Sequence, residues 1–252
     1  MQTFIIMTCL VVSLGWFSII TGIVYAIDRR LCSLMYPAIA KKASRRIFAL
    51  FGTYMDFQFA GDRNLTDELP GQYLVFSNHQ SLLDIPLYMR FLDASRLRFV
   101  AKAELGNHIP LISPMLKSTC HCLVNRKGSP GKVMKEIDVF AVRVIENGWI
   151  PVIFPEGTRS LDGNLGTFHA AGFRRFLDRA PMPVVVCAID GGWRMSSLLG
   201  MAKNMKGGSY RIRILRIFPA PTGKAEQVRI LEEGRLLIQA QLDEWRSAEI
   251  QC

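Results

Sequence analysis

Short apolar runs alternate with stretches of helical spacing from Asp62 to the end of the chain. Compact apolar runs typical of buried strands lie at 73–77, 97–101, 121–125, 149–154 and 183–189, and residues 210–218 alternate like a half-exposed strand. Helical spacing occupies 82–92, 130–147, 170–180 and 225–246, and Gly148 stands where a helix would end. Strands separated by helices predict an α/β fold, a largely parallel central sheet flanked by helices.

The N-terminus has a different pattern. Residues 4–27 carry no charge and exceed the roughly 20 apolar residues that cross a hydrocarbon core. Dense basic residues follow at Arg29, Arg30, Lys41, Lys42, Arg45 and Arg46. By the positive-inside rule, these cations place the rest of the chain on the cytoplasmic face of a membrane, the inner membrane if the source is bacterial.

A second apolar stretch at 47–59 is interrupted by Gly52 and Asp56 and is too short to span, so we expect it at the interface or packed against the following domain. We therefore predict an N-terminal hydrophobic membrane-anchoring helical segment. It is either one spanning helix or a helical hairpin inserted into one leaflet. The predicted division is residues 1–60 for the membrane-anchoring helices and 61–252 for an α/β domain.

The composition narrows the choice of partners. The net charge is +10 with a pI near 9.6, and half of the residues are hydrophobic. This balance favours an acidic partner, and no nucleic-acid-binding signature accompanies it, so we expect membrane lipids and no nucleic acid. Cys120-His121-Cys122 lacks a second ligand pair at a zinc spacing, so we predict no metal site and small buried thiols instead.

The first candidate for chemistry is the stretch 78–84, Asn-His-Gln-Ser-Leu-Leu-Asp, which directly follows a predicted strand. Residues five apart in one regular helix point about 140° apart, so His79 and Asp84 pair only if His79 lies on the turn before the helix. Asp84 would then fix the tautomer of His79, whose other nitrogen would take a proton from a hydroxyl. The alternative is a pair that only caps and packs the helix. Ser81 lacks a Gly-x-Ser-x-Gly elbow and is better explained as a capping serine than as a nucleophile.

The second candidate is the stretch 154–160, Phe-Pro-Glu-Gly-Thr-Arg-Ser, at the end of another predicted strand, where open α/β sheets usually bind ligands. Arg159 is suited to clamp a phosphate, and Glu156 to accept hydrogen bonds from acceptor hydroxyls. The alternative is a Glu–Arg ion pair in a structural turn. Two such stretches at corresponding strand ends favour a functional site.

In their order and separation, these two stretches resemble the glycerolipid acyltransferase family, typified by 1-acylglycerol-3-phosphate acyltransferases. The resemblance covers roughly residues 74–189. It implies acyl transfer from acyl-CoA or acyl-carrier protein, without a further cofactor. It implies that His79 is the general base and Asp84 its partner, and that the second stretch (Glu156, Gly157, Thr158 and Arg159) binds the acceptor.

Two further blocks resemble the family, and they make Lys102 and Arg126 candidate phosphate ligands; the alternative is ordinary surface charge. Cys120 and Val186 stand where the family often has glycine and proline, which bears on the acceptor's identity. The function that we expect is acylation of the sn-2 hydroxyl of lysophosphatidic acid to give phosphatidic acid. The alternatives are another lysophospholipid or lyso-ornithine lipid as acceptor, thioester hydrolysis, or a non-catalytic membrane-binding scaffold.

Overall fold

The computed structural model describes residues 2–106, 116, 119–125, 129–197, 200 and 203–250 of the chain. In this part, seven strands join in one sheet in the order β1-β7-β6-β2-β5-β3-β4. They are β1 (Gln58–Asp62), β2 (Leu74–Ser77), β3 (Leu97–Lys102), β4 (Cys122–Val124), β5 (Ile150–Ile153), β6 (Val184–Asp190) and β7 (Ser209–Phe218). Neighbours from β6 to β4 pair in parallel, whereas β7 runs antiparallel to β6. The predicted α/β fold with a largely parallel sheet is confirmed.

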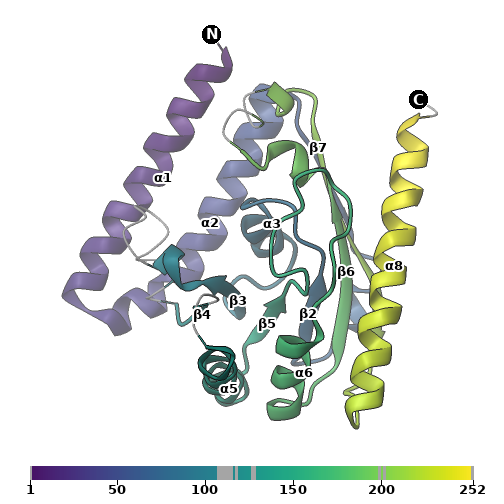
Figure 1. Ribbon diagram of the computed structural model, residues 1–252. Coiled ribbons are helices and arrows are strands. Elements are labelled where there is room, and N and C mark those ends of the chain that lie inside the picture. Colours follow the sequence, from purple (N-terminus) through teal and green to yellow (C-terminus); the bar gives the residue numbers. More distant parts are fainter. Residues whose placement is uncertain are drawn as a thin grey trace.

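Helices cover both faces of this sheet (Figure 1). The α-helices are α1 (Gln2–Ile27), α2 (Arg29–Met55), α3 (Asp84–Phe91), α5 (Pro130–Asn147), α6 (Ala170–Arg179) and α8 (Lys224–Ile250), with short 3-10 helices η1 (Thr66–Glu68), η2 (Ala103–Gly106) and η3 (Gly192–Met195). α2 and α3 contribute to the buried cluster on one face, and α5, α6 and α8 to the cluster on the other. The central strands β2, β5 and β6 are buried between these helices along their whole length, which explains their continuous apolar runs.

α5 illustrates how local sequence sets the element boundaries. Ser129 precedes it in an extended conformation, and Pro130 occupies its first turn, where a missing N–H costs no hydrogen bond. Gly148 ends it with φ +62°, a left-handed conformation that favours glycine. The predicted helix at 130–147 and its glycine cap are both confirmed.

The N-terminal helices differ from the prediction. Within the residues that the structure describes, no helix combines the length and the apolar character needed to cross a membrane, so the expected spanning helix at 4–27 is not supported. α1 instead packs beside α2 (Figure 1). Residues 47–59 form the end of α2 and the start of β1, and Phe48, Phe51 and Met55 are buried in the core, which agrees with the packed alternative.

Strand β1 lies where no strand was expected. It pairs with β7 along five residues and extends across the predicted boundary between residues 60 and 61. Its Gln-Phe-Ala-Gly-Asp sequence lacks a continuous apolar run because it lies at the edge of the sheet and is mostly exposed. The division of the chain into two domains stays a prediction.

Candidate active site

The two candidate stretches meet at one edge of the sheet. β2 pairs with β5 on one side and with β6 on the other, all in parallel. The segments that follow Ser77, Ile153 and Asp190 therefore emerge together at the carboxyl ends of three neighbouring strands. This is the edge at which open α/β sheets bind ligands.

His79 and Asp84 form a close pair at this edge. His79 lies on the turn after β2, and Asp84 is the first residue of α3. The Nδ1 atom of His79 is 2.6 Å from Oδ2 of Asp84. The Asp84 side chain is fully buried, whereas that of His79 is 18% exposed. The predicted pairing is confirmed, and it leaves Nε2 of His79 as the ring nitrogen available to a substrate.

The carboxylate of Asp84 accepts hydrogen bonds at both oxygens. Oδ2 accepts from the backbone N–H of Gln80 at 2.7 Å, in addition to its contact with His79. Oδ1 accepts from the backbone N–H of Ser81 at 3.0 Å and from the hydroxyl of Tyr210 at the start of β7. A buried carboxylate with this many donors is compensated for its lost hydration. Its orientation toward the imidazole is fixed at the same time.

The second stretch holds His79 from the other side. The His79 ring stacks on Phe154, with centroids 4.2 Å apart and planes 11° apart. The backbone N–H of His79 donates to Oε1 of Glu156 at 2.9 Å, and the backbone N–H of Ser160 donates to the carbonyl oxygen of His79 at 2.8 Å. The turn at Gly157, with φ +67°, makes this return of the chain possible. The two stretches therefore form one site.

Glu156 braces two backbone segments. Its Oε2 atom accepts from the N–H of Gly166 at 2.8 Å, while Oε1 accepts from His79. Burial raises the pKa of Glu156, and the hydrogen bonds from Gly166 and His79 oppose that rise. Both oxygens are already bonded to the protein, so the geometry gives this residue a positioning role. Its predicted contact with an acceptor hydroxyl stays a prediction.

The turn between His79 and α3 is also tied to the end of β6. Asn78 exchanges two hydrogen bonds with the backbone of Ile189, at 2.8 and 3.0 Å. Gln80 donates to Asp190 at 3.0 Å and accepts from the N–H of Gly192 at the same distance. These buried contacts keep the turn rigid on both sides of His79.

The remaining predicted ligands lie around this edge. Arg159 is half-buried and donates from Nη1 to the carbonyl oxygen of Ser196 at 3.4 Å, while Thr158 is exposed. Lys102 is the exposed last residue of β3, two strands away from β2 in the sheet. Arg126 lies outside the described residues. The binding roles of Gly157, Thr158, Arg159, Lys102 and Arg126 stay predictions.

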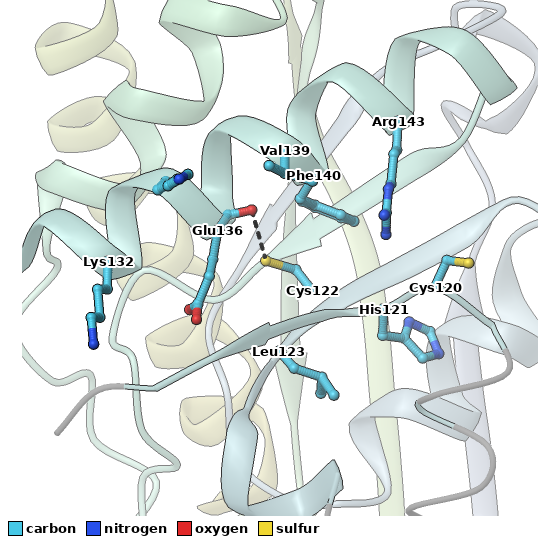
Figure 2. Close-up of a pocket in the computed structure, with 10 residues that line it drawn as sticks. Cys120, His121, Cys122, Leu123, Lys132, Glu136, Val139, Phe140 and Arg143 are labelled. Carbon is cyan, nitrogen blue, oxygen red and sulfur yellow. Dashed lines mark hydrogen bonds between the residues drawn. The ribbon is translucent and has the colours of Figure 1, made fainter. Parts of the chain in front are cut away.

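A cavity of about 390 Å³ lies elsewhere, between β4 and α5 (Figure 2). Its lining includes Cys120, His121 and Cys122 but no residue of the two candidate stretches. Nδ1 of His121 accepts a hydrogen bond from the backbone N–H of Phe99 in β3 at 3.0 Å, so the imidazole has a structural contact with the sheet. In the described part of the chain, no three His, Cys, Asp or Glu side chains are grouped so as to hold a metal ion.

Tyr210 contacts the candidate site, and the sequence analysis did not reveal it. It lies 126 residues after Asp84, on a strand whose antiparallel direction brings its first residues to the carboxyl edge of β6. An isolated tyrosine in an alternating strand gives no local signal of such a contact. Only the order and direction of the strands place it there.

The fold and the site together define the class: an α/β enzyme in which a buried aspartate orients a histidine suited to act as a general base. The particular family follows from comparison with known proteins. The family described as Acyltransferase matches residues 56–190, more than half of the chain, so the protein belongs to the acyltransferase family. The resemblance seen in the two stretches is thereby confirmed.

Individual relatives agree with this assignment. A 1-acyl-sn-glycerol-3-phosphate acyltransferase of Helicobacter pylori is 37% identical over 93 residues, which cover 37% of this chain and 38% of that protein. An enzyme of the same name from Cocos nucifera is 32% identical over 124 residues, covering 48% of this chain and 39% of the relative. The matches thus span well under half of either relative.

A solved structure shows the same fold. The crystal structure of the 1-acyl-sn-glycerophosphate (LPA) acyltransferase PlsC from Thermotoga maritima superposes with a TM-score of 0.65 over 93% of this chain and 95% of that one. The sequence identity is 19%, so this likeness concerns the fold.

Proposed function

We propose that the protein transfers a fatty acyl group from an acyl thioester to the sn-2 hydroxyl of lysophosphatidic acid, giving phosphatidic acid. The donor is acyl-CoA or acyl-carrier protein. The observation that carries the proposal is the contact of 2.6 Å between His79 and the buried Asp84, beside a partly exposed imidazole. The names of the two curated relatives support the choice of acceptor.

The geometry suits direct attack of the acceptor on the thioester. Nε2 of His79 takes the proton of the hydroxyl as its oxygen forms a bond to the thioester carbonyl carbon. Asp84 stabilises the imidazolium that results. When the tetrahedral intermediate collapses, the C–S bond breaks and the imidazolium returns the proton to the leaving thiolate. No acyl-enzyme is needed, because the thioester is already activated.

Arg159 is the described cation best placed to hold the phosphate of the acceptor. The backbone N–H of its chain neighbour Ser160 donates to the His79 carbonyl oxygen. The Arg159 guanidinium therefore lies on the loop that contacts the pair formed by His79 and Asp84. Its hydrogen bond to Ser196 is long, at 3.4 Å, and uses one of its five N–H donors. Lys102 and Arg126 complete the proposed phosphate ligands.

We also propose that the protein works at a membrane surface with α1 in one leaflet. Five apolar residues of α1 at helical spacing are each 54% to 77% exposed: Val12, Trp16, Ile19, Ile23 and Ile27. A stripe of this kind suits burial at the boundary of headgroups and acyl chains. The double variant Ile19→Glu/Ile23→Glu is expected to lose co-sedimentation with phospholipid vesicles, and unchanged sedimentation would contradict this placement.

The reaction is tested with purified protein, a labelled acyl thioester and a panel of lyso-acceptors, with products identified by mass. Acyl-CoA and acyl-carrier protein are supplied in separate reactions. We expect phosphatidic acid from lysophosphatidic acid, and a loss of at least about a hundredfold in His79→Ala, since general base catalysis contributes about that much or more. His169→Ala, which removes an exposed histidine, is the matched control.

The other outcomes separate the alternatives. Acylation of a different lyso-lipid alone would identify another acceptor. Free fatty acid without acylated lipid would identify a thioester hydrolase. Binding to vesicles without turnover of any thioester would favour a scaffold. Undiminished turnover in His79→Ala would refute the proposed mechanism.

A further inference from the structure

Two arginines, Arg63 and Arg90, lie over the rings of an aromatic patch made by Phe48, Phe59 and Phe91, which come from α2, β1 and α3. The guanidinium of Arg90 lies 4.6 Å from the ring centroid of Phe59 and 5.6 Å from that of Phe48. The guanidinium of Arg63 lies 5.8 Å from the ring centroid of Phe91.

Arg45 completes this cluster from one turn before Phe48 on α2. Residues three apart on a helix share a face, so its side chain starts on the side of α2 that carries Phe48. We call Arg45, Arg63 and Arg90 the arginine cluster.

The arginine cluster has no acidic counterpart in the part of the chain that the structure describes. Among the residues that the structure describes, none of the three arginines forms an ion pair with a carboxylate. Asp62, the chain neighbour of Arg63, is bonded to Arg213 at 2.6 Å. Burial, and then the positive charges of Arg45 and Arg63, lower the pKa of Arg90. Like charges repel one another, and an anion placed among these arginines would replace that repulsion with attraction.

An apolar groove lies along α1, beside the face of α2 that carries Arg46. Arg46, the neighbour of Arg45, lies 5.8 Å from the ring centroid of Phe17 on α1. It lines a cavity of about 520 Å³ together with apolar α1 residues that include Val12, Trp16 and Ile19. Cations beside an apolar groove fit a ligand with an anionic head and a hydrocarbon tail.

We propose that Arg45, Arg63 and Arg90 bind the phosphate of an anionic lipid whose acyl chain lies along the groove between α1 and α2. The site is separate from the dyad. β1 runs parallel to β7 and therefore opposite to β2, so Arg63 lies beyond the amino edge of β2. Arg90 is six residues along α3 from Asp84, about 9 Å of helix rise. The bound lipid orients the protein on an anionic membrane and is not consumed.

The test uses the full chain and measures binding without turnover, so it does not depend on the proposed reaction. The double variant Arg45→Gln/Arg63→Gln removes two exposed cations of the cluster and keeps the half-buried Arg90. The matched control, Lys135→Gln/Arg143→Gln, removes two exposed cations from α5. Co-sedimentation is measured with phosphatidylcholine vesicles that contain phosphatidylglycerol and with pure phosphatidylcholine vesicles.

We expect the cluster variant to bind the anionic vesicles on the order of 25-fold more weakly than the unmodified chain, about fivefold for each cation near the surface. The control variant should bind nearly as the unmodified chain does, and pure phosphatidylcholine should show little difference among the three. An equal loss in both variants would reveal only a general attraction of the net charge, and would overturn the proposal.

A second measurement distinguishes a lipid from a soluble phosphate. Inorganic phosphate is added during thermal unfolding of the unmodified chain and the cluster variant. A rise in melting temperature that the variant loses, together with weakened vesicle binding, supports a phosphate site used by a lipid. The same rise with unaltered vesicle binding would assign the cluster to a soluble phosphate compound and overturn the lipid as its ligand. Matching circular dichroism spectra confirm that the variants are folded.

Discussion

The hydroxyl of Tyr210 donates a hydrogen bond to Oδ1 of Asp84 across 126 residues of sequence. Both groups are fully buried. Because this oxygen also accepts from the N–H of Ser81, the carboxylate turns its other oxygen, Oδ2, toward His79. A residue of β7 thus helps to orient the Asp84 carboxylate of the first candidate stretch.

Substitution Tyr210→Phe should lower kcat while leaving KM nearly unchanged. Loss of one hydrogen bond to a buried carboxylate costs about 1 to 3 kcal/mol, and a tenfold fall in kcat corresponds to about 1.4 kcal/mol. We therefore expect a decrease of roughly tenfold or more in steady-state assays. Tyr73→Phe alters another buried tyrosine that does not contact the dyad, and it is the control. Equal kinetics in the two variants would show that the Tyr210 contact is only structural.

Substitution Glu156→Gln should loosen both backbone segments that Glu156 holds. The amide has one acceptor atom, so one of the N–H groups of His79 and Gly166 loses its partner. We expect a loss of about 1 to 3 kcal/mol in the free energy of unfolding, measured with urea, and a fall in kcat. Glu146→Gln, at an exposed position of α5, should change neither. Full activity and stability of Glu156→Gln would contradict the bracing role.

Substitution Arg159→Gln tests the proposed phosphate ligand. Hydrogen bonds to charged groups contribute about 1.5 to 3 kcal/mol, so KM for lysophosphatidic acid should rise by roughly 10- to 100-fold. Monoacylglycerol, which lacks the phosphate, should be used equally poorly by the variant and by the unmodified enzyme. If KM for both acceptors rises together, the arginine supports the loop and does not bind phosphate.

His121 should make the fold less stable in mild acid. Burial, aided by the charge of Arg98, lowers the pKa of His121 from 6.5 to about 3. As the pH falls below 6.5, His121 binds a proton in the unfolded chain but stays neutral in the folded chain. His121 therefore leaves the free energy of unfolding unchanged above about pH 6.5. Below that pH, the free energy of unfolding falls by about 1.4 kcal/mol for each pH unit until about pH 3.

Urea unfolding at pH 7, 6 and 5 checks this dependence. His121→Gln keeps an acceptor for the N–H of Phe99 and should show a shallower decline. His169→Gln, at an exposed histidine, should follow the unmodified chain. Parallel curves for all three proteins would show that His121 does not control the acid response.

Much of the fold could be predicted from the sequence because the central strands are buried on both faces. Residues 73–77 and 183–189 read as strands, and they form β2 (Leu74–Ser77) and β6 (Val184–Asp190). Strand β1 was not predicted because it lies at the edge of the sheet, where a mostly exposed strand does not require a continuous apolar run. The charged sequence of α2 shows no regular apolar stripe. Its burial depends on contacts with α3 and the sheet, which cannot be inferred from local sequence.

The site was predictable to the extent that its residues are close in sequence. The pairing of His79 with Asp84 follows from five residues of chain and one turn. The contact between His79 and Glu156 joins residues 77 positions apart, and it was expected only as proximity of two strand ends. The contact of Tyr210 with Asp84 depends on the reversed direction of β7, which no short pattern encodes.

The position of Tyr210 on the final strand has a consequence for biosynthesis. Chains emerge from the ribosome N-terminus first, so His79, Asp84 and Glu156 are all synthesised before Tyr210. Until β7 inserts beside β6, the Asp84 carboxylate lacks one of its hydrogen-bond donors. In a nascent or prematurely terminated chain, the Asp84 carboxylate is therefore less firmly oriented toward His79 than in the finished fold.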